Sequence, residues 1–217
     1  MSKVVERVGV IGDIHAEHAH LKAALDVLEA RGLELVIATG DVVDGLGSVD
    51  LCCELLAAHR VVTVCGNHDR WLLAGTSRDL PDATNPASVS DRSRAFLESL
   101  PRMVELSTPS GLALLCHGLG SNDMAKVAPD DFGYALESND DLQNLLRNRY
   151  FRWVINGHSH HRMVRAFSGV SVINAGTLKR DHSPSFLEID FVRASVLVFQ
   201  FAIDGTVSLP PAAVALR

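Results

Sequence analysis

Metal-binding types of side chain follow five apolar runs of this sequence. They are two aspartates, four histidines and one asparagine: Asp13, His15, Asp41, Asn67, His117, His158 and His160. Carboxylate, imidazole and amide ligands together suit Mn²⁺, Fe, Zn²⁺ or Co²⁺, whereas Ca²⁺ and Mg²⁺ prefer oxygen alone and Cu(I) prefers sulfur. The helical HExxH arrangement is absent. The set therefore indicates a transition-metal site built from loops at strand ends.

The spacing of these residues supports one shared site. Asp13 with His15, and His158 with His160, stand two positions apart. Extended backbone sends alternate side chains to the same face, so we expect each pair to reach one site from one strand end. A lone Gly-Asp is usually a turn and a lone histidine usually structural, but five such strand ends favour a common function.

The tetrapeptide at residues 66–69, Gly-Asn-His-Asp, places an amide beside an imidazole. It follows the apolar run 61–65, so we expect it where a buried strand opens into a loop. For Asp69 we expect a capping or supporting role.

The elements that position these residues alternate between strand and helix. The pattern predicts strands at 8–11, 35–38 and 61–65, with helices at 21–30, ended by Gly32, and at 50–58. This order is typical of parallel strands joined by right-handed crossovers, whose loops converge at one sheet edge. A helix capped by Ser90 and ending at Pro101, a strand at 112–116, a helix at 140–149 and a strand at 153–155 follow.

The rest of the chain contains two long loops and a final run of strands. Residues 75–90 and 119–133 are irregular, and we expect the first to be able to cover the strand ends and both to influence substrate choice. Strands at 170–173, 186–191 and 196–203 have no helix between them, so we expect an antiparallel portion.

Composition predicts a single globular domain over residues 1–217 in the cytoplasm. The chain has 47% hydrophobic residues but no apolar run long enough to span a membrane, and charges near its start argue against a signal peptide. The net charge of −6 argues against an extended nucleic-acid surface. Four cysteines without a CxxC pair indicate buried thiols in a reducing compartment: Cys52, Cys53, Cys65 and Cys116.

Taken together, the motifs resemble those of the calcineurin-like metallophosphoesterases, in the same order and over residues 7 to about 178. They are Gly12-Asp13-Ile14-His15, Gly40-Asp41-Val42-Val43-Asp44, Gly66-Asn67-His68-Asp69, His117 and Gly157-His158-Ser159-His160. The resemblance implies an α/β fold, a two-sheet β-sandwich flanked by helices, with a dinuclear metal site at the carboxyl ends of the strands. Residues 174–177, Asn-Ala-Gly-Thr, resemble the Asn-Pro-Gly-Ser stretch of small prokaryotic phosphodiesterases.

Carried over residue by residue, the resemblance implies two ligand sets that share Asp41. One set is Asp13, His15, Asp41 and His160, and the other is Asp41, Asn67, His117 and His158. His68 matches the family's general acid, and Asp44 matches the carboxylate that orients it. The implied cofactors are two divalent ions, Mn²⁺ first, with Fe, Zn, Ni or Co as alternatives.

The implied activity is hydrolysis of a small phosphodiester or nucleotide by a metal-bridging hydroxide. Two divalent ions bring about +4, and Asp13, Asp41 and the hydroxide return about −3, so the pocket stays cationic for phosphate. A phosphomonoesterase, a phosphoprotein phosphatase and a dinucleoside-polyphosphate hydrolase are alternatives. Gly45 stands where the protein-phosphatase branch has arginine, which weakens the phosphoprotein reading.

A non-catalytic scaffold is the alternative from another class, because a retromer subunit shares this fold. The presence of His68 with all seven ligands favours an enzyme. Natural substrate and oligomeric state, including a homo-oligomer, stay open. We expect structural or exposed roles for the histidines outside the motifs, with substrate contact the weaker alternative for the last: His18, His20, His59, His161 and His182. Arg70 and Trp71 are expected to be helix residues.

Overall fold

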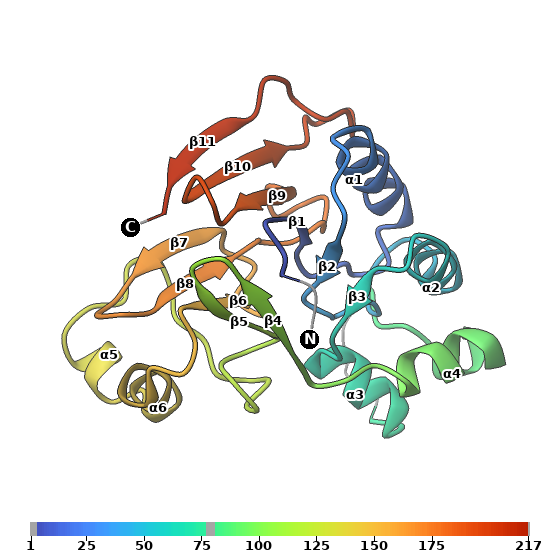
Figure 1. Cartoon of the computed structure of the whole chain (residues 1–217). Coiled ribbons are helices and arrows are strands. Elements are labelled where there is room, and N and C mark those ends of the chain that lie inside the picture. The colour runs from blue at the N-terminus through green and yellow to red at the C-terminus, as the bar shows by residue number, and fades with distance from the viewer. Residues whose placement is uncertain (1–3, 77–80, 217) are drawn as a thin grey trace.

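Two β-sheets pack face to face with helices on their outer sides (Figure 1). The computed structural model describes residues 4–76 and 81–216. The first sheet has six strands in the order β11-β10-β9-β1-β2-β3, and the second has five in the order β4-β5-β6-β8-β7. The predicted α/β two-sheet sandwich is thereby confirmed.

The first sheet contains the parallel unit that the sequence predicts. β1 (Arg7–Ile11), β2 (Val36–Ala38) and β3 (Val62–Thr63) are parallel neighbours. They are joined through α1 (His18–Ala30) and α2 (Val49–Ala58). Three strands extend the sheet beyond β1 in antiparallel order: β9 (Ser185–Asp190), β10 (Ser195–Gln200) and β11 (Ala212–Ala215).

The second sheet contains strands that the sequence pattern missed. Its members are β4 (Met103–Thr108), β5 (Gly111–Cys116), β6 (Trp153–Asn156), β7 (Met163–Ala166) and β8 (Ser171–Asn174). The expected antiparallel portion is confirmed for β9 and β10. β8 is antiparallel to β7, but it also pairs in parallel with β6, which the sequence did not predict. β7 reverses the chain, so β8 can return beside β6 without a crossover helix.

The remaining helices are short and lie near the loops. They are α3 (Asn67–Leu73), the 3₁₀ helix η1 (Pro86–Ser88), α4 (Asp91–Glu98), α5 (Tyr134–Glu137) and α6 (Asp140–Asn148). Ser90 caps α4 as predicted, because its hydroxyl accepts a hydrogen bond from the Ser93 N–H at 3.2 Å. The expectation of a loop at 66–69 is wrong, since Asn67 is already the first residue of α3.

Apolar side chains fill three layers. Val10, Leu115 and Ile155 belong to the cluster between the sheets. The leucines at helical spacing in α1 pack with α2 on the outer face of the first sheet, and Leu142 of α6 covers the outer face of the second. Cys52, Cys53 and Cys116 are buried within these layers, while Cys65 is half-buried. In the described part of the chain, no helix has the length and apolar character to cross a membrane.

One carboxylate of the first sheet is held by two arginines. Glu188 of β9 has only 3% of its surface exposed, its carboxylate accepts from Arg7 Nη2 at 2.6 Å, and Arg31 Nε donates to its other oxygen. Burial acts to raise the pKa of Glu188, but the hydrogen bonds from Arg31 and Arg7 lower it overall. A lowered pKa stabilises the fold at pH values above the unfolded-state pKa, and this contribution is lost as the pH falls through the folded-state pKa.

We expect Glu188→Gln to destabilise the protein at neutral pH by about 1–2 kcal/mol. This is less than the 3–5 kcal/mol of a fully buried pair, because both arginines are about one-third exposed. Urea unfolding at pH 7 and pH 3 measures the effect. The difference from the parent should shrink at pH 3, because below the ordinary pKa of glutamate the unfolded chain takes up the proton that the arginine-paired Glu188 resists. Glu105→Gln, at an exposed position of β4, is the control. An equal difference at both pH values would contradict the prediction.

Candidate metal centre

The seven predicted ligands lie together at one edge of the two-sheet sandwich. Asp13 and His15 follow β1, Asp41 follows β2, and Asn67 begins α3. His117 follows β5, while His158 and His160 follow β6. The centre therefore draws on both sheets. Five of these side chains are buried, and His158 and His160 are partly exposed.

The backbone turns these side chains inward by a different route from the one expected. His15, His158 and His160 have φ values of 48°, 63° and 59°, in the left-handed region. The expectation that each i, i+2 pair lies on extended backbone is therefore wrong. Left-handed residues other than glycine cost free energy and cluster at functional sites, where the surrounding structure holds them. Asp41 and Asp44 share this feature, with φ values of 45° and 64°.

One group of four side chains has the arrangement of a metal site. One ligand atom from each of Asp13, His15, Asp41 and His160 lies within 4.8 Å of all the others. His15 Nε2 stands 2.9 Å from His160 Nε2, and His160 Nε2 stands 3.4 Å from Asp13 Oδ2. His15 Nδ1 donates to the carbonyl oxygen of Asp44 at 2.8 Å, which leaves Nε2 facing the group.

A second group adjoins the first. Asn67 Oδ1 stands 2.8 Å from His117 Nε2 and 2.8 Å from His158 Nδ1. His117 Nδ1 donates to the carbonyl oxygen of Thr39 at 2.7 Å, so its Nε2 points into the centre. Asp41 Oδ2 lies 3.3 Å from His117 Nε2 and 3.9 Å from His15 Nε2, between the two groups. It therefore belongs to both groups of side chains.

The residues present fit bound cations. Asp13 Oδ2 is buried without a hydrogen-bond partner, yet it points at the imidazole of His160. A buried carboxylate oxygen left in this way is costly unless a positive charge compensates it. The facing Nε2 atoms of His15 and His160 also converge on one point. Together with the mixed oxygen and nitrogen donors, these features suit a divalent transition metal.

Three histidines are uncharged at neutral pH and so are ready to act as ligands. Burial lowers the pKa of His160 to about 3 and that of His158 to about 4. Burial also lowers the pKa of His15. Each imidazole then keeps a lone pair for a cation.

Without a bound cation, protons held by Asp13 and His117 offset the negative charge of the buried carboxylates. Burial raises the pKa of Asp13 to about 7. Burial acts to lower the pKa of His117, but the Asp41 and Asp13 carboxylates outweigh it and raise that pKa to about 10. In turn, the charge of His117 outweighs burial and lowers the pKa of Asp41. A cation bound here would replace these protons.

We expect Mn²⁺ binding to release protons and to tighten as the pH rises from below 7 towards 10. The reason is that ligands bind cations in their deprotonated forms, while Asp13 and His117 hold protons at neutral pH. Calorimetric titrations at pH 7 in two buffers of different ionisation enthalpy should give about one to two protons released. His59→Gln is the control: His59 lies beyond the end of α2, so this variant should release the same number of protons as the parent. Equal heats in both buffers would contradict the prediction.

His68 stands at the edge of the centre with its ring held by Asp44. His68 Nδ1 lies 2.6 Å from Asp44 Oδ2, and His68 Nε2 lies 3.9 Å from Asp41 Oδ2. The ring is therefore bound on one nitrogen and directs the other toward the shared carboxylate. Thr84 fixes Asp44 in turn: the Thr84 N–H donates to Asp44 Oδ1 at 2.7 Å, and the Asp44 N–H donates to Thr84 Oγ1 at 2.8 Å.

Asp69 supports the tetrapeptide and the loop that carries Asp41. Its Oδ2 accepts from the Gly66 N–H at 2.9 Å, and its Oδ1 accepts from the Val42 N–H at 2.8 Å. These bonds match the capping and supporting role expected for Asp69. They also explain why a helix begins at residue 67, since the Asp69 carboxylate accepts the N–H of Gly66, the residue directly before the helix.

Several residues support Asp13 and the histidine loop through hydrogen bonds. Thr39 donates from Oγ1 to Asp13 Oδ1 at 2.9 Å, and Thr177 donates from Oγ1 to the Asp13 carbonyl oxygen at 2.8 Å. Asn174 Nδ2 donates to the Gly157 carbonyl oxygen at 2.5 Å, which gives the stretch at 174–177 a structural role beneath the histidine loop. Only the resemblance at 174–177 had marked any of these positions.

The other residues singled out from the sequence lie in helices and loops near the centre. His18 and His20 lie in the first turn of α1, and Arg70 and Trp71 lie in α3, as expected. Arg70 forms an ion pair with Asp123 of the 119–133 loop at 2.6 Å. In the 75–90 loop, residues 77–80 lie outside the described part, and Thr84 reaches the strand ends through Asp44.

Comparisons with known proteins agree with this fold. A family model described as the calcineurin-like phosphoesterase superfamily domain matches residues 7–193. A curated relative is an uncharacterised protein of Methanocaldococcus jannaschii, 24% identical over 192 residues, which cover 85% of this chain and 74% of the relative.

Two solved structures show the same fold. A metallophosphoesterase from Sphaerobacter thermophilus has a TM-score of 0.68 at 19% identity, over 91% of this chain and 88% of that one. A single-substitution variant of Vps29 from Entamoeba histolytica has a TM-score of 0.58 at 18% identity, over 97% of this chain and 99% of that one.

Proposed function

The chain belongs to the calcineurin-like phosphoesterase superfamily, and on that premise we propose that it is a phosphodiesterase acting on a small phosphodiester or nucleotide with two divalent ions, Mn²⁺ first among them. The seven ligands would hold the ions in two groups that share Asp41. The bound ions would supply Lewis acidity, positive charge for the phosphoryl oxygens and an activated water.

The observation that carries this proposal is the placement of His68. A fold that serves only as a scaffold has no need of an imidazole clamped at 2.6 Å by a carboxylate and facing the metal-site residue Asp41. Nδ1–H of His68 donates to Asp44, and the other ring nitrogen, Nε2, faces Asp41 at 3.9 Å. His68 would donate a proton from Nε2 to the departing oxygen of the ester.

The remaining residues of the centre position the reaction. Asp44 holds the tautomer and the orientation of His68, and Thr84 holds Asp44. Asp41 accepts the His68 backbone N–H at 2.9 Å through Oδ1 and faces the centre with Oδ2, so one carboxylate ties the acid to the ligand groups. The geometry that fixes the proton donor is thus the same geometry that fixes the shared ligand.

Paired chromogenic esters test the proposal. Protein loaded with Mn²⁺ should hydrolyse bis-p-nitrophenyl phosphate with a higher kcat/KM than p-nitrophenyl phosphate. Faster turnover of the monoester would favour a phosphomonoesterase. No turnover of either ester with Mn²⁺, Ni²⁺ or Zn²⁺, together with no bound metal, would favour a scaffold, the role suggested by the Vps29-like fold.

A further inference from the structure

A polar groove leads away from the candidate metal centre at His160. A cavity of about 430 Å³ opens beside this histidine and is lined by Arg162, His182, Ser183 and Gln200 among others. A second cavity of about 450 Å³ shares Ser183 and Gln200 with the first. The two cavities therefore adjoin, and together they have the size of a small-molecule site.

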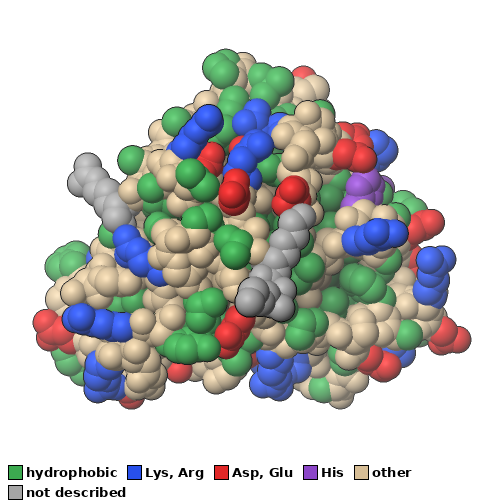
Figure 2. Space-filling view, in the orientation of Figure 1, with side chains coloured by type: hydrophobic (Ala, Val, Ile, Leu, Met, Phe, Trp, Pro, Cys, Tyr) green, Lys and Arg blue, Asp and Glu red, His purple; other side chains and the backbone are tan. Residues whose placement is uncertain are grey.

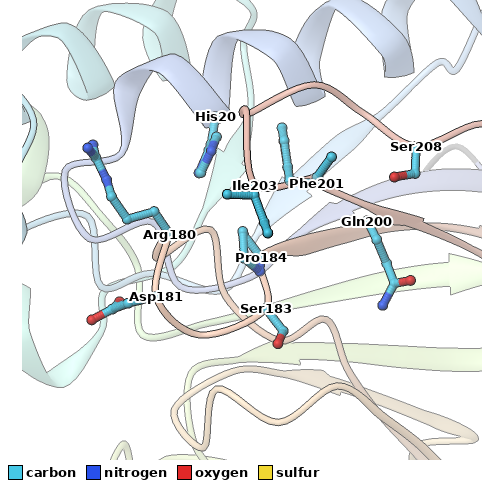
Figure 3. Close-up of a pocket in the computed structure, with 10 residues that line it drawn as sticks. His20, Arg180, Asp181, Ser183, Pro184, Gln200, Phe201, Ile203 and Ser208 are labelled. Atoms are coloured by element: carbon cyan, nitrogen blue, oxygen red, sulfur yellow. The ribbon is translucent and has the colours of Figure 1, made fainter.

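The cavity of about 430 Å³ beside His160 is the near part of the groove, and the cavity of about 450 Å³ is its far part. The far part combines apolar and hydrogen-bonding surface. Figure 3 shows Pro184 and Ile203 in the middle of this cavity, with Arg180 on one side and Gln200 on the other. The Ile203 side chain is fully exposed, although it is large and apolar. Apolar walls with a few amides and hydroxyls are typical of sites that bind a flat ring and read its polar edge, as a nucleobase requires.

The near part of the groove carries the positive charge of the Arg162 guanidinium. Over residues 4–76 and 81–216, no acidic side chain lies within the 4.0 Å ion-pair distance of the Arg162 guanidinium. With its amide oxygen turned toward this guanidinium, Gln200 accepts from Nη1 at 3.0 Å and from Nη2 at 3.3 Å. By contrast, five other arginines of the described chain form ion pairs with carboxylates: Arg7, Arg31, Arg70, Arg180 and Arg193.

His182 joins the near part of the groove to the centre. Its ring lies 5.2 Å from the ring of His160, and its Nδ1 lies 2.8 Å from Asp181 Oδ1. The pocket that holds Arg162 thus begins at a metal-site residue. A guanidinium there would bind a phosphate through two parallel hydrogen bonds, for which its planar fork is suited.

We propose that this groove binds a nucleoside esterified to the scissile phosphate, and that Arg162 binds a second phosphate carried by that nucleoside. The inference rests on the proposed phosphodiesterase function. The scissile phosphate would lie at the ligand groups next to His160, the second phosphate at Arg162, and the base over Pro184 and Ile203. Arg162 is then a specificity-determining residue, because it distinguishes substrates by one anionic group remote from the bond that breaks.

Two chromogenic esters that release the same p-nitrophenolate test this assignment. One is the p-nitrophenyl ester of thymidine 5′-phosphate, and the other carries an additional 3′-phosphate. The Mn²⁺-loaded protein should prefer the phosphorylated ester by about tenfold or more in kcat/KM, the usual size of a charge-assisted hydrogen bond. In Arg162→Gln the ratio of the two values should fall to near one. Arg193→Gln, at an exposed arginine that follows β9, should keep the ratio of the parent.

Direct binding separates failure of this inference from failure of the proposed function. Thymidine 3′,5′-bisphosphate should bind the metal-loaded parent more tightly than thymidine 5′-phosphate, and Arg162→Gln should remove the difference. Binding of this kind without turnover of any ester would keep the groove and reject the phosphodiesterase. Turnover with no preference in the parent, or a preference that Arg162→Gln retains, would overturn the inference alone. Neither turnover nor binding would overturn both.

Discussion

His68→Ala lowers the turnover of a phosphodiester with a strongly basic leaving group by about 10²- to 10⁴-fold, if His68 is the general acid. The structural reason is that Asp44 holds its Nδ1 at 2.6 Å, while Nε2 faces the centre. The loss should be much smaller for p-nitrophenolate, which departs without a proton. Steady-state kinetics on p-nitrophenyl and alkyl diesters of otherwise equal structure measures the two losses.

Metal content provides the control for this variant. His68 is not one of the seven ligands, so the substitution removes a proton donor and leaves both ligand groups in place. Elemental analysis should find as much Mn²⁺ in His68→Ala as in the parent. Loss of metal would show that His68 acts as a ligand, and an equal loss of rate for both leaving groups would show that it acts in positioning.

The candidate site was predictable from the sequence because its residue types are rare together. Asp13, Asp41 and His117 each follow an apolar run, and the parallel strands of each sheet bring such positions to the same edge of the sandwich. The details of the backbone could not be predicted in this way. Left-handed conformations at His15 and His160 depend on tertiary contacts that hold strained residues in place, and sequence spacing carries no trace of them.

The supporting residues show a second limit. Thr39 binds Asp13 through its hydroxyl, and Thr84 binds Asp44 through its hydroxyl and its backbone N–H. A threonine in a strand end or loop has no distinctive sequence pattern. The same holds for Arg162, whose guanidinium contacts the amide oxygen of Gln200, whereas Arg7 and Arg180 contact carboxylates. Such a difference in partners becomes visible only in three dimensions.

The fold shows where periodicity fails as a signal. β7 and β11 have four residues each, and all four positions of β11 are exposed, so neither has the buried alternation that predicts a strand. β8 was recognised as a strand, but its pairing depends on the unrecognised β7.

On the face seen in Figure 2, lysine and arginine side chains are scattered among acidic ones rather than gathered in one patch.

Substitution of Gly66 should strongly weaken metal binding, because Gly66 lies against Asp41. A Cβ atom at this position would stand 2.1 Å from Asp41 Oδ1 and 2.4 Å from the Asp41 backbone nitrogen. The backbone contact cannot be relieved by a side-chain rotation. Gly66→Ala should therefore move the start of α3 away from the loop of Asp41, which separates Asn67 from the shared carboxylate.

We expect Gly66→Ala to weaken Mn²⁺ binding by about 10- to 100-fold, the usual cost of disturbing the support of a metal ligand. Calorimetric titration of folded protein, at a temperature well below its unfolding transition, measures the affinity. Gly9→Ala is the matched control: its Cβ would meet the Leu28 Cδ1 atom at 2.8 Å, the end of a flexible side chain remote from the centre. That variant should lose stability by overpacking and keep its metal.

Asp41→Asn keeps the prediction testable if Gly66→Ala fails to fold. The amide has nearly the shape of the carboxylate but lacks its charge, so it removes the shared ligand without the steric displacement. If the two ligand groups depend on Asp41, this variant should show the same loss of Mn²⁺ affinity with a smaller change in unfolding temperature. Parent-like affinity in both variants would mean that the groups bind cations independently, and that the contact between Gly66 and Asp41 serves folding alone.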